Sequence, residues 1–302
     1  MANAALPDRP MQKAPSKTKA ALWMSGWLTL TLVMAIAGRE SARELNLFQV
    51  MEMRSILGFF LLYPFIHFNG GLAIVKTTRL PQHVVRNLIH YGAQLCWFFA
   101  LTIIPIGQVV AIEFTMPIWT AILAAAFLGE RMTVWKVAAI VLGLIGVLVI
   151  VRPATGEINP GQLIALAAAV GFGISIALVK FLTRTENTLS IIFWMLVVQS
   201  AAGLIPSLFV WIWPSAHSCA WIVVIAICGT FSHFCMARAM LYADATIVIP
   251  MDFLRVPLTA TAGWLLYAEK LDVLTVLGAA LILTGNLLNL KSNAPLPARA
   301  EA

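Results

Sequence analysis

Ten apolar stretches of 18 to 25 residues run through this 302-residue chain and set what it can fold into. A helix needs about 20 apolar residues to cross the roughly 30 Å hydrocarbon layer of a membrane. The connections are short and contain turn formers, as in Ile104–Gly107 and Trp213–Ser215, so no soluble domain fits between the stretches. We expect spans over residues 20–37, 47–67, 88–105, 107–128, 134–151, 163–182, 189–213, 219–241, 245–268 and 273–290.

Composition makes the bilayer the solvent for most of this chain. Apolar residues contribute 61% of it and charged residues 11%, against about 45–50% and 25% in soluble domains. Twenty Lys and Arg and thirteen Asp and Glu could hardly cover a soluble exterior. The predicted fold class is an all-α integral membrane protein, because a helix satisfies its own backbone hydrogen bonds in lipid.

The distribution of Lys and Arg predicts the orientation. If the N-terminus lies inside, thirteen of the twenty cations fall in inward-facing segments and four in outward loops, while Arg54, Arg238 and Arg255 lie within spans. Cytoplasmic loops carry the excess of Lys and Arg, so we expect both termini in the cytoplasm. The net charge of +7 then reflects topology and contact with anionic lipid. No nucleic-acid partner is expected, since that would need a solvated basic face.

An internal repeat divides the chain. A shift of 139 residues aligns 96–148 with 235–287 without a gap and gives thirteen identities in 53 positions, against roughly one in ten expected by chance in Ala- and Leu-rich segments. A shift of 142 aligns the second span with the seventh. The matched pairs include Glu113/Asp252, Phe114/Phe253, Glu130/Glu269, Gly146/Gly285 and Pro64/Pro206.

Two five-helix halves predict an inverted repeat, because an odd number of spans makes the second copy enter the membrane from the opposite side. Such a pair has two tilts of nearly equal energy, one open inward and one open outward. A cleavable signal peptide is the alternative for the first run, but this run is long for one and has a partner in the second half. The predicted organisation is a basic disordered tail (1–19), two repeats (20–151 and 163–290) and a second tail (291–302).

Several segments resemble a known family. Arg54 lies near the start of the second span in "MRSILGFFLL", and the first half ends in "MPIWTAILAAAFLGERMTVWKVAAIVLGLIGVLVIV", with a weaker copy later. Together with ten spans in two inverted halves, these segments resemble the EamA type of the drug/metabolite transporter superfamily over about residues 20–290. The first span lacks the usual Trp-Gly-Ser-like opening, and Ala268–Lys270 replaces a second Gly-Glu-Arg.

The resemblance implies transport of a small organic metabolite. Members carry amino acids, nucleobases, vitamins, sugars and other metabolites, and most characterised relatives are bacterial inner-membrane exporters or proton-coupled carriers. For the Gly-Glu-Arg run at 129–131, we expect a structural role at the turn into the next helix, with a gate latch as the functional alternative.

Ionisable residues inside spans are the candidate site, because burying a charge in a membrane is costly. Asp252 and Arg255 are three residues apart and can form a local ion pair without a role in transport. Glu113 occupies the matched position in the first half without a local cation, so it must find one across the bundle, bind a proton or meet the substrate. Glu52, Arg238 and Arg54 lie within two turns of a helix end, so snorkelling to water is the alternative for these three. The polar candidates are Glu113, Asp252, Arg255, Arg54, His233 and Gln94.

Aromatic side chains in the central spans could stack a planar or amine-bearing metabolite. The alternative is that they only fill helix interfaces and the membrane belt. Three of them, Trp97, Trp119 and Trp194, join the candidate pathway.

We therefore expect a secondary active transporter with export of an amino acid or related compound as the narrower hypothesis and proton coupling open. The alternative is a non-transporting receptor or scaffold that retains the fold. An enzyme is not expected, and the chain contains no nucleotide-binding loop, His-Glu-x-x-His or nucleophile elbow. Cofactors and metals are likewise not expected. The expected partners are a small-molecule substrate and the lipid bilayer, in a monomer or homodimer.

Overall fold

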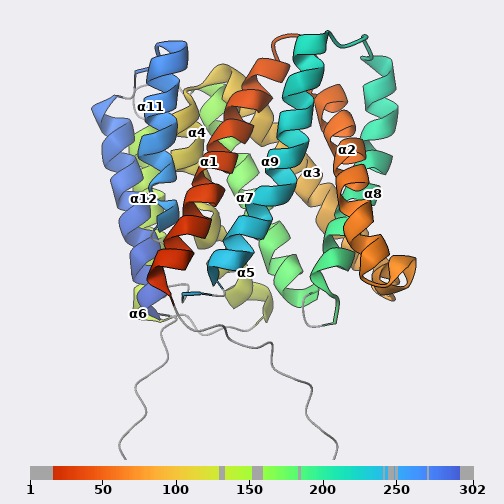
Figure 1. Cartoon of the computed structure of the whole chain (residues 1–302). Helices are drawn as coiled ribbons and strands as arrows, with labels where there is room; N and C mark the ends of the chain where they lie inside the picture. The colour runs from red at the N-terminus through yellow and green to blue at the C-terminus, as the bar shows by residue number, and fades with distance from the viewer. Residues whose placement is uncertain are drawn as a thin grey trace, which may run out of the picture.

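The structure is a computed structural model that describes residues 16–128, 133–151, 159–182, 185–240, 242–243, 248, 251–270 and 272–292. A few side chains inside these ranges, among them His233, lie outside the description. In the described part of the chain every regular element is helical (Figure 1). The elements are α1 (Lys17–Ser41), α2 (Leu47–Phe68), η1 (Gly71–Val75), α3 (Leu80–Ile103), α4 (Ile106–Glu113), α5 (Met116–Leu128), α6 (Val134–Val151), α7 (Pro160–Leu182), α8 (Thr188–Phe209), α9 (Ala216–Met240), α11 (Arg255–Tyr267) and α12 (Val273–Ser292).

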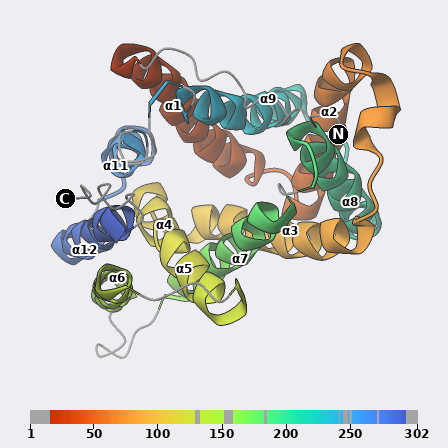
Figure 2. The same ribbon diagram turned by 90° about the horizontal axis from the view of Figure 1, so that it is seen from below.

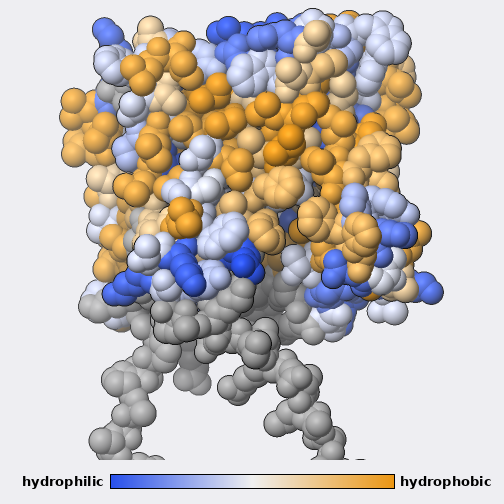
Figure 3. Space-filling view, viewed as in Figure 1, coloured by the Kyte–Doolittle hydropathy of each residue, from blue (hydrophilic) through white to orange (hydrophobic). Residues whose placement is uncertain are grey.

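The surface of the bundle matches a bilayer. Figure 3 shows a band of apolar side chains around the middle, with hydrophilic side chains gathered above and below it. Large apolar side chains in this exterior are open to their surroundings, for example Phe60 at 66% and Leu265 at 66% exposure. Six described helical segments are long and apolar enough to cross a membrane. The chain is an all-α, multi-pass membrane protein.

Two of the expected spans are broken. The run predicted as one helix over 107–128 is α4 followed by α5, with the interruption at Phe114 and Thr115. In the run predicted over 245–268, helical residues 251–252 are separated from α11 by turns at 253–254. Pro117 and Pro257 lie in the first turn after each break. Proline has no N–H to bond four residues back, so each helix restarts where its proline is tolerated.

The third helix begins at Leu80, eight residues before the apolar run predicts. Its first two turns carry His83, Arg86 and Asn87, all of which are buried. Hydropathy underestimated this helix because it counts such residues as loop, whereas Pro81 in the first turn is a helix-start signal.

Helix pairs from opposite halves of the chain make the main contacts. α1 packs on α9, α3 on α7, α2 on α8, α6 on α12 and α4 on α11, and Figure 2 shows the first two pairs side by side. The α6–α12 pair is close enough to require glycine: a Cβ at Gly146 would lie 2.6 Å from the Gly278 carbonyl oxygen, and one at Gly285 would lie 2.8 Å from that of Ala139. Small residues at helix crossings permit such approach.

A polar contact ties α1 to the broken helix at one end of the bundle. Glu269, in the turn between α11 and α12, accepts from the backbone N–H of Ile106 at 2.9 Å and pairs with Arg39 of α1. A carboxylate at a helix N-terminus satisfies a free N–H and complements the helix dipole. The matched run at 129–131 lies outside the described residues, so its role as turn or latch stays a prediction.

Candidate functional site

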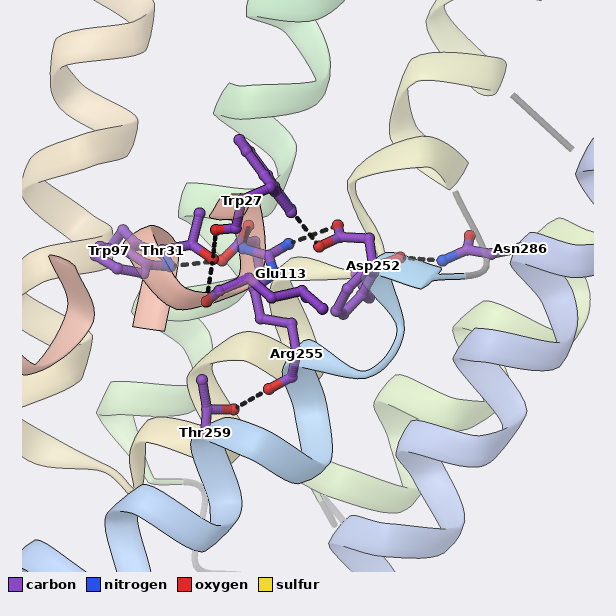
Figure 4. A network of polar contacts seen from close by, with 10 residues as sticks. Trp27, Thr31, Trp97, Glu113, Asp252, Arg255, Thr259 and Asn286 are labelled. Carbon is purple, nitrogen blue, oxygen red and sulfur yellow. Dashed lines mark hydrogen bonds and ion pairs between the residues drawn. The ribbon is translucent and has the colours of Figure 1, made fainter. Parts of the chain in front are cut away.

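The two helix breaks bring three ionisable side chains together. Glu113 is the last residue of α4, Asp252 precedes the second break, and Arg255 is the first residue of α11. Arg255 donates from Nη1 to Glu113 Oε1 at 2.8 Å and from Nη2 to Asp252 Oδ2 at 3.3 Å (Figure 4). All three side chains are at most 12% exposed. We call this group the carboxylate–arginine triad.

Each carboxylate of the triad also accepts a hydrogen bond from an indole. Trp97 of α3 donates to Glu113 Oε2 at 2.8 Å, and Trp27 of α1 donates to Asp252 Oδ1 at 2.5 Å. Arg255 lies over the ring of Phe114 at 4.8 Å and that of Trp27 at 5.9 Å. The two acids therefore have similar surroundings, each with one indole and a share of one guanidinium.

A side chain of α12 satisfies a backbone carbonyl at the first break. Asn286 of α12 donates to the Phe114 carbonyl at 2.8 Å. Phe114 and Phe253, matched in the repeat, meet edge to face at 5.5 Å. Irregular backbone at membrane depth is tolerated only where protein or water satisfies it, and the Asn286 contact meets this need at the first break.

The triad carries one excess negative charge when all three groups are ionised. One guanidinium balances one carboxylate, and the second carboxylate remains without a cation of its own. A net charge inside a membrane protein is costly. This arrangement therefore leaves one negative charge that a cationic group could balance.

Comparison with known proteins places the chain in a family. The EamA-like transporter family matches it twice, over residues 18–152 and 159–291. The chain belongs to this family.

Individual relatives of this EamA-like transporter are named as carriers of small molecules. An S-adenosylmethionine uptake transporter of Rickettsia prowazekii is 29% identical over 86% of this chain and 90% of its own length. A riboflavin transporter of Brucella anthropi is 31% identical over 72% of this chain and 79% of its own. A pseudopaline exporter of Pseudomonas aeruginosa is 27% identical over 83% and 88%. A solved crystal structure superposes with a TM-score of 0.64 at 18% identity, covering 93% of this chain and all of that one, which supports the fold alone.

The family and these relatives identify the chain as a small-molecule transporter, a class distinct from enzymes.

Four sequence-predicted residues meet at the breaks of this EamA-like transporter: Glu113, Asp252, Arg255 and Trp97. The local Asp252–Arg255 pair is present. Glu113 was expected to find a cation across the bundle, bind a proton or meet the substrate. The structure shows the first of these, and the cation is Arg255, which also pairs with Asp252. If the Asp252 charge were removed, Glu113 would still pair with Arg255.

The remaining predicted residues lie outside the triad. Arg54 and Gln94 bond each other at 3.1 Å in a separate cluster. The Trp119 indole of α5 donates to the Thr115 hydroxyl, at the break just before this helix, at 3.1 Å. That of Trp194 donates to the Val75 carbonyl of η1 at 2.9 Å. These two aromatics serve helix contacts, and the His233 side chain is outside the described residues.

Sequence reasoning missed two residues that hold the site. Trp27 was not singled out because a tryptophan in an apolar run looks like any membrane aromatic. Asn286 carried a usable signal: an amide in the middle of the run "ALILTGNLLNL" is costly in lipid unless it has a partner.

Proposed function

We propose that this chain is a secondary active transporter that moves a small organic metabolite across a bacterial inner membrane by alternating access. The protein would have ten spans in two inverted five-helix repeats, with both termini in the cytoplasm. The curated relatives described above come from bacteria and are named as transporters. In Figure 1, α1 begins and α12 ends toward the same face of the bundle, in keeping with this topology.

The triad at the two breaks is the observation that carries the proposal. Many transporters bind substrate and coupling ion where interrupted helices from the two repeats meet. Here Glu113 and Asp252 are matched acids of the two halves, each lies at a break, and one guanidinium joins them. A group that binds at this point contacts both halves at once and can bias their relative tilt.

The helix contacts support the inverted repeat. Under the repeat, α1 corresponds to α7 and α3 to α9, so the α1–α9 contact is the counterpart of α7–α3, and both occur. The same exchange turns the close approach of Gly146 to Gly278 into that of Gly285 to Ala139. Both approaches are present: a Cβ added at either glycine would lie 2.6–2.8 Å from the facing carbonyl oxygen.

Proton coupling follows from the excess charge. Because one arginine serves two carboxylates, the proton would belong to the pair rather than to Glu113 alone. Neutralising either acid would leave one carboxylate with one guanidinium and remove the excess charge. Glu113→Gln and Asp252→Asn should therefore have the same effect on coupling.

The test uses proteoliposomes loaded with a pH-sensitive dye and a panel of amino acids, nucleosides, vitamins and sugars. We expect at least one compound to move protons with the parent protein, and neither Glu113→Gln nor Asp252→Asn to do so, while exchange at equal pH continues. If only one of the two variants lost the response, the proton would belong to one residue. Transport without any dye change would remove proton coupling.

The same panel of metabolites in proteoliposomes would determine the direction of transport and the substrate. Export of an amino acid or related compound is our narrower proposal. The relatives include an uptake transporter and an exporter, so flux should be measured in both orientations of the gradient.

A further inference from the structure

A second polar cluster lies between α2, α3 and α8, apart from the triad. Glu52 and Arg54 of α2 are 2% and 7% exposed, so neither snorkels to water as their nearness to the helix start suggested. No ion pair joins them among the described contacts. Residues two apart on a helix do not face each other, so these two buried side chains do not pair with one another.

Among the described residues, Arg54 donates hydrogen bonds to neutral groups. Its Nη2 donates to Gln94 Oε1 at 3.1 Å and to Gln199 Oε1 at 2.8 Å. Its Nε has no hydrogen-bond partner in the described structure, and neither has the Gln199 amide nitrogen. A buried guanidinium normally pairs with a carboxylate or phosphate, so this one is set to receive an anionic group.

Among the described residues, Glu52 also lacks a hydrogen-bond partner at one of its carboxylate oxygens. Its Oε2 and the Tyr91 hydroxyl are both buried without a hydrogen-bond partner in the described structure. A Cβ at Gly203 of α8 would lie 2.6 Å from that Oε2 and 2.8 Å from the Tyr91 oxygen. Only glycine lets these two oxygens sit so close to the α8 backbone.

An apolar cavity adjoins the guanidinium. Besides Arg54, its walls include Gly58 of α2, Met195 and Leu196 of α8, and Ile225 and Gly229 of α9. A Cβ at Gly229 would lie 3.8 Å from Arg54 Nη1, so the bare backbone leaves room beside the charge. The surroundings suit an aliphatic group attached to an anionic one.

We propose that this cluster binds a zwitterion of the α-amino-acid type. Its carboxylate pairs with Arg54, its ammonium pairs with Glu52 and the Tyr91 hydroxyl, and its aliphatic side chain enters the cavity. The proposal deepens the transport function and depends on it. Selectivity follows from charge: a ligand with only one charged group leaves the opposite protein charge buried and unpaired, which binding sites reject strongly.

The test compares L-leucine with two analogues that each lack one charge, 3-methylbutylamine and 4-methylpentanoic acid. Binding to the purified full chain in detergent is measured by calorimetry and thermal shift. We expect each analogue to bind at least about tenfold more weakly than leucine, and Arg54→Gln and Glu52→Gln each to weaken leucine by a similar factor. Arg238→Gln, which removes another cation of a span, is the matched control and should keep leucine binding.

Leucine binding that is unchanged in Arg54→Gln, or analogues that bind as well as leucine, would overturn the subsite. So would the absence of binding by leucine, methionine and phenylalanine to the parent protein, a result that needs no variant to fold. The metabolite panel in proteoliposomes separates the two failures. Flux of a compound that is not a zwitterion refutes the subsite and keeps transport, whereas flux of no compound refutes transport itself.

Discussion

Stability of the carboxylate–arginine triad tests its geometry without knowledge of the substrate. In Asp252→Asn or Glu113→Gln, the remaining acid still pairs with Arg255, because the guanidinium lies 3.3 Å from one and 2.8 Å from the other. We expect either single change to alter the free energy of unfolding by no more than about 1 kcal/mol, since a one-to-one pair replaces a group with excess charge.

The double variant should behave differently. It leaves a buried guanidinium without a counter-charge, and losing one side of a buried pair costs about 3–5 kcal/mol. The coupling between the two changes is then about 1–5 kcal/mol, outside the few tenths expected for independent sites. Adding Arg255→Gln to the double removes the stranded charge and should restore most of the loss.

The assay is reversible unfolding of all variants in mixed micelles, with thermal unfolding as a second measure. A loss of 3–5 kcal/mol corresponds to roughly 6–20 °C in Tm at 2–4 °C per kcal/mol. Additive single effects would refute the shared guanidinium. A large loss in Asp252→Asn alone would mean that Glu113 does not hold Arg255 in the absence of the Asp252 charge.

Three further outcomes follow from described contacts and the predicted topology. Gly146→Ala should lower Tm markedly because its Cβ would meet an α12 backbone oxygen at 2.6 Å, while Gly92→Ala, with nothing within 4 Å, should not; equal effects would refute the α6–α12 packing. Two serine hydroxyls before and in α9 lower the pKa of Glu44 below its ordinary value of 4.5, so the stability it contributes is present at neutral pH, begins to fall near pH 4.5 and is lost only as pH falls through the lower folded-state pKa; Glu44→Gln should lower Tm at pH 7, and this difference should shrink steadily as pH falls below 4.5, whereas a constant difference would contradict this. In intact cells on a cysteine-free background, an impermeant thiol reagent should label Glu157→Cys and not Ile74→Cys, and the reverse would invert the topology.

The helices could be predicted from sequence, and their interruptions could not be read from hydropathy. Apolar runs of span length dictate helices because lipid offers the backbone no other partner. A hydropathy profile does not detect the breaks, because Phe114 and Phe253 are as apolar as their neighbours. Pro117 and Pro257 indicate where the breaks lie, because each lacks the N–H whose hydrogen bond would continue a helix through the break.

The members of the site were more predictable than their pairing. The cost of burying charge pointed to Glu113, Asp252 and Arg255 without any structure. The Glu113–Arg255 contact joins residues 142 positions apart and depends on both breaks, so spacing along one helix could not reveal it. Glu52 was set aside because its place in the helix allowed snorkelling, and only its burial at 2% exposure excludes that reading.

Counterflow in sealed proteoliposomes tests the central claim of alternating access most directly. Vesicles are loaded with one unlabelled compound of the panel and diluted into a trace of the same labelled compound, with no ion gradient present. A transporter must accumulate label transiently above its equilibrium level, because inward and outward states exchange the two pools, and we predict such an overshoot for at least one metabolite. Saturable binding of label without any overshoot, for every compound that binds, would contradict the account and identify a receptor or scaffold that retains the fold.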